Sequence, residues 1–376
     1  MHALIDQDKQ RIAKRYRGQN RLVSIASFVI MLAALLAFLF LGVSRDLATF
    51  AGNVVSARMV VILIYFTVMY VSYSVIAFPF VYWSGFVIEH RFDFSRQTFR
   101  QWIVDWVKSF FVGFILGGIV FEVIYLVTHA SAHLWWLWLA LFMIIFSVIL
   151  ANLFPVLILP LFYKTSPLDD TELKQRIQAL CKRVNIPIQG VFSINLSSKS
   201  TKANAAVAGL GNTKRILLGD TLLADYSQDE TISVLAHEIT HFAEHHMWWL
   251  VGIQSVVTLV LFYVLNRVYP MLYGLAGFEH VREIAAFPVF ALAFAGLSYV
   301  AKPLSAGVSR YFERRADRGA LDSTGDADSF ISVMAKFCNK QLMIAYPHPL
   351  IEWYKYSHPS PGNRIRFAEN WQKSQR

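Results

Sequence analysis

Six stretches of this sequence are long, apolar and nearly free of acidic or basic side chains. They are residues 22–44, 59–88, 109–132, 133–163, 247–266 and 284–301. A helix needs about 20 apolar residues to cross the hydrocarbon core of a bilayer. Glu122, in the third stretch, is the one carboxylate within them. We therefore expect six membrane-spanning helices, four before residue 164 and two after residue 246.

Composition supports an integral membrane protein. Hydrophobic residues make up 56% of the 376 residues and charged residues only 16%, and the mean hydropathy is +0.44. A soluble protein of this length has no means to bury so much apolar surface, so lipid must cover part of it. The first stretch is too long for the apolar region of a cleavable signal peptide and follows a charged segment. We expect it to remain as a membrane helix.

Lysine and arginine side chains collect at the ends of the expected helices. Six of them precede the first stretch, and four more follow the second. Positive residues mark the cytoplasmic side of a membrane, so both termini and the segment 164–246 are predicted to be cytoplasmic. The net charge of +10 agrees with this asymmetry. Because the basic residues flank the spans instead of forming a stripe, no nucleic-acid partner is expected. No phosphate-binding glycine loop indicates a nucleotide.

The apolar stretches divide the chain into four segments. They are a membrane block of four spans over 1–163, a soluble segment over 164–246, a two-span block over 247–301 and a soluble segment over 302–376. The first soluble segment has an α/β pattern: a helix over 171–184, strands over 190–196 and 215–218, a small-residue extended segment over 203–210, and a helix over 230–246 that runs almost directly into the fifth span. The second is predicted to be mainly helical up to Pro347, after which repeated prolines predict loops.

An HExxH motif, His237, Glu238 and His241, lies in the helix predicted over 230–246. Two histidines four apart lie one turn apart on the same face of a helix, close enough to share a zinc ion. The glutamate beside the first histidine can take a proton from a water at that metal and pass it to a leaving amine. Incidental histidines in an amphipathic helix produce the same short pattern. The position beside a membrane span favours the metal site.

A catalytic zinc needs a third protein ligand and an open position. His245 and His246 follow the motif, but His245 is eight residues beyond His237, roughly 12 Å along a helix and too far for one ion. The glycine and histidine that extend the motif in metzincins are absent at 244 and 247. The best candidate is Glu313, one turn before Asp317, because one acid can bind metal while the other accepts a histidine N–H. A solvated charged helix explains both acids equally well, since arginines surround them.

Further blocks of sequence add to the motif. They are residues 88–98 (IEHRFDFSRQT), 160–168 (PLFYKTSPL), 204–210 (NAAVAGL), 214–223 (KRILLGDTLL), 309–317 (SRYFERRAD) and 358–365 (HPSPGNRI). In this order they resemble the integral membrane zinc proteases that include the type-1 CAAX prenyl protease (the yeast a-factor-converting enzyme) and the HtpX proteases. The resemblance covers nearly the whole chain. The number of spans departs from it, since the prenyl proteases have seven and the HtpX proteases fewer than six.

The resemblance implies roles for the residues that match. His237, His241 and Glu313 correspond to the ligands of one zinc ion, and Glu238 corresponds to the catalytic base. Asp317 corresponds to the acid that holds a ligand histidine. With these matches, the solvated-helix interpretation of Glu313 becomes improbable.

The resemblance also implies how a substrate is held. His358 and Arg364 correspond to residues near the scissile carbonyl, where either can stabilise an oxyanion. A turn and a surface charge are the alternative explanations for these two residues. An edge strand that pairs with substrate corresponds to residues at and around Asn204, Ala205, Ala206 and Gly209. Their small side chains let another backbone approach closely, and a proline at position 206 or 208 is predicted to disrupt the pairing.

We therefore predict a mostly α-helical integral membrane protein, with about six transmembrane helices and a cytoplasmic zincin-like α/β metalloprotease domain. Its substrates are peptides or proteins, lipidated or not: misfolded or membrane-associated polypeptides, or prenylated C-terminal peptides. The bilayer is the inner membrane of a bacterium, or the endoplasmic reticulum membrane in a eukaryote. The alternative is a non-catalytic membrane scaffold or channel-like protein with structural zinc. Structural sites are usually closed by four ligands, often cysteine, so three N/O ligands beside an acid favour catalysis.

Overall fold

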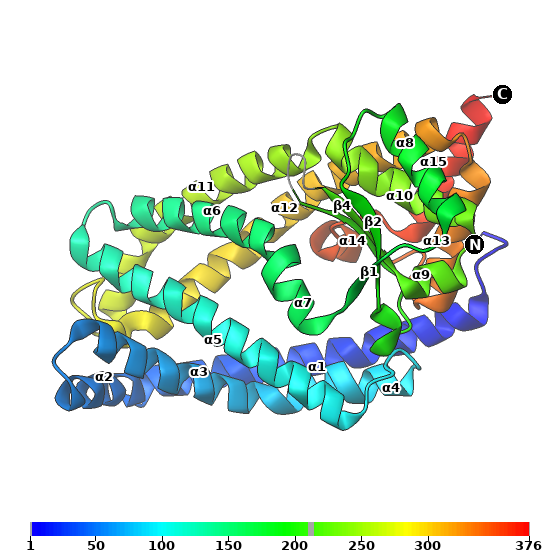
Figure 1. Ribbon diagram of the computed structural model, residues 1–376. Helices are drawn as coiled ribbons and strands as arrows, with labels where there is room; N and C mark the ends of the chain where they lie inside the picture. Colours follow the sequence, from blue (N-terminus) through cyan, green and yellow to red (C-terminus); the bar gives the residue numbers. More distant parts are fainter. Residues whose placement is uncertain (1, 210–213, 376) are drawn as a thin grey trace.

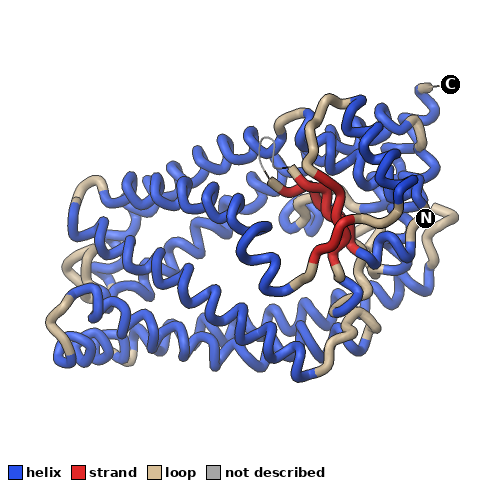
Figure 2. The backbone as a smooth tube through the Cα atoms, viewed as in Figure 1, coloured by secondary structure: helices blue, strands red, loops and turns tan. Residues whose placement is uncertain are grey.

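The computed structural model describes residues 2–209 and 214–375. A small sheet lies at one end of a group of long helices (Figures 1 and 2). Both ends of the chain lie at the end of the molecule that holds the sheet (Figure 1). Leu210, the last residue of the predicted extended segment, lies outside the described residues.

Within the described residues, six helices are long and apolar enough to cross a membrane, which confirms the predicted number. They are α1 (Gln7–Phe40), α3 (Arg58–Tyr82) with its continuation through η1 (Trp83–Ile88) and α4 (Glu89–Arg91), α5 (Phe99–Ala130), α6 (Trp135–Leu153) with η2 (Phe154–Ile158) and α7 (Leu159–Phe162), α11 (His246–Leu275), and α12 (Phe287–Thr324), which follows η5 (Ile284–Ala286). The shorter α2 (Val43–Val54) joins α1 to α3.

The membrane helices pack through small residues and aromatic rings. On α5, a side chain at Gly113 would meet the Tyr70 hydroxyl of α3 at 2.5 Å, and one at Gly117 would meet the Phe66 ring at 3.2 Å. Close approach of this kind is how helices associate where water supplies no hydrophobic driving force. Many apolar side chains on the long helices are exposed, such as Val75 at 67%, which is the surface that lipid covers.

The four-stranded sheet has the order β1-β2-β4-β3. The strands are β1 (Thr165–Pro167), β2 (Gly190–Ile194), β3 (Ala205–Ala208) and β4 (Arg215–Gly219). β2 and β4 are parallel, and the other two pairs are antiparallel. β3 is therefore an edge strand, and one side of its backbone is free for another chain.

The two soluble segments share one apolar core. Leu218 of β4 and Leu235 of α10 (Gln228–Ala243) are buried with Phe330 of α13 (Ala327–Lys340) and Ile365 of α15 (Pro361–Ser374). The helices of this part are α8 (Thr171–Arg183), α9 (Asp220–Asp225), α10 (Gln228–Ala243), α13 (Ala327–Lys340), α14 (Pro349–Lys355) and α15 (Pro361–Ser374), with the short η3 (Leu196–Ser198). Residues 164–246 and the chain after the last span thus form a single unit.

A capping box begins α10, the helix that carries the HExxH motif. The Ser227 hydroxyl accepts from the Glu230 N–H, and the Glu230 carboxylate accepts from the Ser227 N–H at 2.7 Å. The same carboxylate accepts from Ser332 at 2.6 Å and from Lys336 at 2.5 Å, both on α13. Burial alone would raise the pKa of Glu230, but Lys336, Ser332 and Ser227 outweigh it and lower that pKa. The charged carboxylate therefore stabilises both the helix start and its packing.

Replacing Glu230 with glutamine is expected to destabilise the protein by about 1–2 kcal/mol at neutral pH. A carboxylate with a lowered pKa in the folded state contributes stability above its unfolded pKa and loses it as the pH falls through the folded pKa. The difference between parent and variant should therefore shrink on acidification. Thermal unfolding of the detergent-solubilised proteins at neutral and acid pH measures it. Glu172→Gln, an exposed residue in the first turn of α8, is the control and should change little.

The predicted end of the motif helix was wrong. One helix was expected over 230–246, but α10 ends at Ala243 and α11 begins at His246. Between them His245 has φ 57° and ψ 28°, in the left-handed region. A single residue in that conformation ends an α-helix and turns the chain. The break allows His246 to lie beside His241, which a continuous helix would prevent.

The loops predicted after Pro347 were also wrong in part. Pro349 and Pro361 stand at the start of two helices, α14 and α15. Proline is favoured in the first helical turn, because the missing N–H has no partner there in any helix. Glu352 of α14 accepts from the Ser360 N–H at 2.8 Å, which fixes the start of α15.

Candidate metal centre

The two histidines of the motif face the same point. On α10 their Nε2 atoms lie 3.3 Å apart. The helix is held in place by Leu235, Ala236 and Ile239, which are buried in the core of the soluble part. His237 is only 7% exposed, so its ring has little freedom to turn away.

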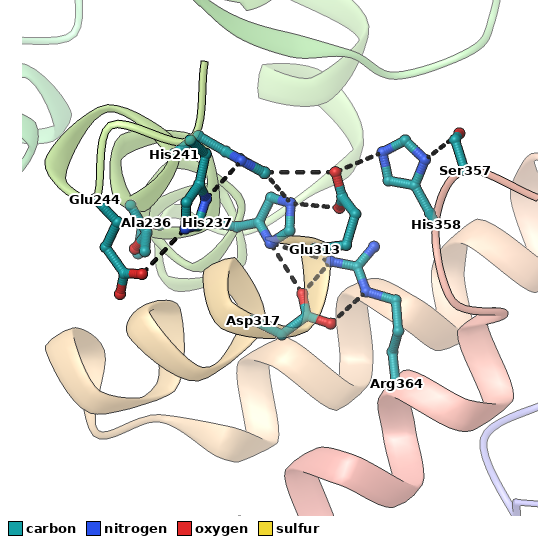
Figure 3. Close-up of polar contacts among 11 residues, drawn as sticks. Ala236, His237, His241, Glu244, Glu313, Asp317, Ser357, His358 and Arg364 are labelled. Carbon is teal, nitrogen blue, oxygen red and sulfur yellow. Dashed lines mark hydrogen bonds and ion pairs between the residues drawn. The ribbon is translucent and has the colours of Figure 1, made fainter. Parts of the chain in front are cut away.

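Glu313 of α12, expected from the sequence to be the third ligand, lies beside the two motif histidines. Its Oε2 lies 3.1 Å from His237 Nε2, and its Oε1 lies 3.5 Å from His241 Nε2. One atom from each residue lies within 4.8 Å of the others. Figure 3 shows the carboxylate of Glu313 directed at both rings.

The close approach of α10 and α12 depends on a glycine. A side chain at Gly319 of α12 would meet the Thr240 methyl group of α10 at 2.4 Å. Thr240 lies between the two histidines of the motif and donates its hydroxyl to the Ala236 carbonyl at 2.7 Å. Without a side chain at Gly319, the two helix backbones can come close enough for Glu313 to reach the histidines.

Asp317 lies on the other side of His237. Its Oδ1 is 2.9 Å from His237 Nδ1, and its Oδ2 accepts from Arg364 Nε of α15 at 2.9 Å. A second nitrogen of Arg364 also donates to this carboxylate. Asp317 therefore accepts the Nδ1 proton of His237, which leaves the Nε2 lone pair directed at Glu313 and His241.

Charge at the site favours a cation. Burial alone would lower the pKa of His237, but Asp317 and Glu313 outweigh it and raise that pKa to about 9. Burial and the neighbouring His237 lower the pKa of His241 to about 4, so its ring is neutral at pH 7. The enclosed position of Glu238 raises its pKa above the ordinary glutamate value. The carboxylates of Glu313 and Asp317 flank His237, and His241 adds a neutral imidazole, so a positive charge on a proton or a metal ion is favoured here.

These residues fit zinc. The buried Oε2 of Glu313 has no hydrogen-bond partner among residues 2–209 and 214–375. It lies 3.1 Å from Nε2 of His237, whose other ring nitrogen, Nδ1, is 2.9 Å from Asp317. Two imidazoles and one carboxylate are the donor set of a catalytic zinc site with an open fourth position. A metal at this point would take the place of the proton that His237 otherwise shares with Glu313.

Five of the remaining predicted residues line a cavity next to this point, whereas Ala206 and Gly209 line a separate cavity along β3. The first cavity has a volume of about 260 Å³, and its walls include Glu238, His358, Arg364, Asn204 and Ala205. His358 Nε2 lies 3.2 Å from Glu313 Oε1, and Figure 3 shows its ring on the opposite side of Glu313 from the motif histidines. Residues of both soluble segments, one before the fifth span and one after the last span, therefore line a single cavity.

The guanidinium of Arg364 is bound by Asp317. Nε and Nη2 are engaged by Asp317, and the side chain is 9% exposed. The third nitrogen, Nη1, has no hydrogen bond in the part of the chain that the structure describes. The two bonds to Asp317 fix the orientation of the guanidinium.

Family models match nearly the whole chain. Residues 167–372 match the model described as peptidase family M48. This chain belongs to peptidase family M48. Residues 1–164 match a second model, described as CAAX prenyl protease N-terminal, five membrane helices.

Individual M48 relatives come from bacteria and eukaryotes. The chain is 29% identical over 312 residues to CAAX prenyl protease 1 of Saccharomyces cerevisiae, covering 78% of this chain and 68% of that protein. It is 29% identical over 291 residues to the uncharacterized metalloprotease YhfN of Bacillus subtilis, covering 76% and 68%. The crystal structure of Ste24p from S. mikatae superposes with a TM-score of 0.88 at 26% identity, covering 98% of this chain and 90% of that one.

The family confirms the predicted activity class. An M48 peptidase with six candidate membrane helices and a His-His-Glu site is a membrane zinc metalloendopeptidase. The non-catalytic scaffold is therefore not supported. The predicted fold class, mostly helical with a small α/β protease part, is confirmed as well.

Two features of this M48 site were missed by the sequence reasoning. His246 was considered only as a possible metal ligand, yet it contacts His241. Its position after a helix break gave no signal in the periodic pattern. The close contact of Gly319 with Thr240 had no signal either, because it joins two helices far apart in the chain.

Proposed function

We propose that the chain binds one zinc ion through His237, His241 and Glu313, and hydrolyses peptide bonds in the cavity beside Glu238. The observation that carries this proposal is the group of three ligand atoms within 4.8 Å. Glu238 lines the same cavity and adjoins the first ligand in sequence. The three ligands leave a coordination position open, as a hydrolytic zinc requires.

When bound, zinc supplies a Lewis acid that polarises the scissile carbonyl and makes a nearby water more acidic. Glu238 takes a proton from the attacking water and gives it to the leaving nitrogen. Its raised pKa suits this exchange, because a carboxylate whose pKa lies nearer the working pH is a stronger base toward water. Asp317 and Arg364 hold the ring of His237 in place during the reaction.

Charge that develops on the carbonyl oxygen needs a donor. We assign this role to His358 and to Nη1 of Arg364, since both residues line the same cavity as Glu238. A donor preorganised in an enclosed site contributes about 3–4 kcal/mol to the transition state. Because Asp317 already holds the guanidinium, Arg364 need not move to donate to the carbonyl oxygen.

Substrate is held along the free edge of β3. Asn204 and Ala205 line the catalytic cavity, and β3 continues from Ala205 to Ala208 along a second cavity, whose lining also includes Gly209. An extended peptide paired with this edge gains main-chain hydrogen bonds with little demand on its sequence. His237 and Glu238 line the same cavity as Asn204 and Ala205, so a peptide paired with β3 would pass the proposed zinc site.

The experiment that tests this function is proteolysis by the purified protein in detergent or lipid. An unfolded polypeptide should be cleaved, a zinc chelator should stop cleavage, and added zinc should restore it. Chelator-insensitive cleavage, or none by a protein that carries zinc, would contradict the proposal.

A second cavity favours a lipidated substrate. It has a volume of about 480 Å³ and extends along β3 between the α6–α7 region and the start of α11. Phe154, Leu159, Trp248 and Val251 are among its largely apolar lining residues. It adjoins the catalytic cavity, because Asn204 lines both. We therefore propose that an isoprenoid-like chain near the scissile bond lies here, in keeping with the prenyl protease relatives.

Filling this cavity is expected to discriminate between substrates. Ala151 lines it, and Ala151→Trp should lower kcat/KM for a farnesylated peptide about tenfold. Excluding two methylene groups costs about 1.6 kcal/mol, which is roughly that factor. The same peptide without lipid should be cleaved as by the parent. Val156→Trp, on an exposed residue of η2 outside the lining, is the matched control. Equal loss for both peptides would contradict a lipid site.

For the orientation, we propose that both termini and the protease part are cytoplasmic. The even number of candidate spans and the basic residues near the N-terminus support this arrangement. In a bacterium the membrane would be the inner membrane, and in a eukaryote that of the endoplasmic reticulum. A reporter that is active only in the cytoplasm, fused after the last residue, should be active. Activity of a reporter that works only outside the cytoplasm would refute the arrangement.

A further inference from the structure

His246, the first residue of α11, lies beside a zinc ligand without being one. Its Nδ1 is 3.1 Å from Nδ1 of His241, and its side chain is only 1% exposed. Its ring packs against Phe312 of α12, with ring centroids 4.8 Å apart. The left-handed conformation of His245 turns the chain so that His246 reaches back to the previous helix.

A chain of contacts continues from His246 to the surface. His246 Nε2 lies 3.0 Å from Glu244 Oε2. Glu244 also accepts from Arg315 Nε of α12 at 2.7 Å. Figure 3 shows Glu244 on the side of His241 away from Glu313. The row therefore runs from the metal point, through two imidazoles, to a carboxylate that an arginine holds.

The positions of the protons in this row follow from the metal site. His241 directs Nε2 at the ligand point, so a neutral ring carries its proton on Nδ1. That N–H needs an acceptor, and Nδ1 of His246 is the acceptor within reach. His246 then carries its own proton on Nε2 and donates it to Glu244. In this arrangement each ring has one N–H that donates and one nitrogen lone pair, which faces the metal point in His241 and accepts in His246. Both imidazoles are then neutral.

We propose that His246 is a positioning residue that fixes the tautomer and orientation of His241, with Glu244 and Arg315 holding His246 in turn. The proposal rests on the zinc site proposed above. When one ring nitrogen of a ligand histidine donates to an acceptor, the other nitrogen is left with its lone pair facing the metal. The hydrogen bond also makes that nitrogen more basic. Asp317 does this directly for His237, whereas His241 reaches a carboxylate only through a second imidazole.

Zinc affinity tests the proposal without reliance on activity. His246→Phe keeps a ring but removes the acceptor, so zinc affinity should fall about 10- to 100-fold, measured by competition with a chromophoric chelator. His246→Asn places an amide oxygen near the position of Nδ1 and should recover most of the affinity. Glu244→Ala should cause a smaller loss. His245→Asn, on the neighbouring exposed residue, tolerates the left-handed backbone and should leave affinity unchanged.

Thermal unfolding of the zinc-free proteins separates a loss of affinity from a loss of fold. Parent-like zinc affinity in His246→Phe overturns the proposal, and so does an equal loss in His246→Asn, which would indicate packing alone. If His246→Phe does not fold, Glu244→Ala decides, and unchanged affinity there overturns the row of contacts. A parent protein that binds no zinc would instead contradict the proposed function.

Discussion

Replacing Glu238 with glutamine is expected to reduce cleavage about 10³-fold or more while the protein keeps its zinc. General acid–base groups contribute about 10²–10⁴-fold to rate, and 10³-fold corresponds to about 4 kcal/mol of transition-state stabilisation. Glutamine has nearly the same shape as glutamate but takes no proton from water. Glu238 is not among the three ligand residues, so metal content should stay at about one zinc per chain, measured by elemental analysis.

Glu313→Gln is the matched variant, because it changes the buried acid that we propose as the third zinc ligand. Because Glu313 is a ligand in our proposal, this variant should lose zinc affinity as well as activity. Comparing the two variants separates a base from a ligand, although both are buried acids near His237. If Glu313→Gln binds zinc like the parent, Glu313 is not a ligand. If Glu238→Gln retains substantial activity with zinc bound, another group serves as the base.

Sequence reasoning succeeded where a local pattern has one structural solution. An uncharged apolar stretch of about 20 residues can only be buried or cross a membrane, so the six long helices were predictable. The spacing of His237 and His241 fixes their geometry on any α-helix. Glu313 was different: the residues alone left it equally well explained as a solvated acid, and the family resemblance decided for it.

Tertiary contacts account for what the sequence did not predict. The turn at His245 comes from one residue with a positive φ, which no periodic pattern reveals. Pro349 and Pro361 start helices because the residues before them find hydrogen-bond partners outside those helices. The Ser360 N–H, for example, donates to the Glu352 carboxylate. The orientation of alternate residues in β3 required the register with β4, which is a pairing between separate segments.

That register decides which β3 residue a substrate can pair with. The Gly219 N–H donates to the Asn204 carbonyl at 2.9 Å. Along an antiparallel pair, residues alternate between facing the partner strand and facing away. Ala206 and Ala208 thus point their N–H groups at β4, while Val207 points its N–H at the free edge. Proline at 206 or 208, the sites chosen from sequence, would therefore break the sheet instead of the substrate contact.

Val207→Pro is expected to reduce kcat/KM about 10- to 100-fold while the protein stays folded and keeps its zinc. It removes one main-chain donor to substrate, worth about 1–1.5 kcal/mol, and its ring obstructs the paired peptide. An edge strand tolerates proline where the N–H faces outward. Ala206→Pro is the matched control: it removes an inward N–H, so it should lower the unfolding temperature and the zinc content together. Measuring cleavage, unfolding and bound zinc in both variants distinguishes the two effects. Parent-like cleavage by Val207→Pro would mean that substrate does not pair with this edge.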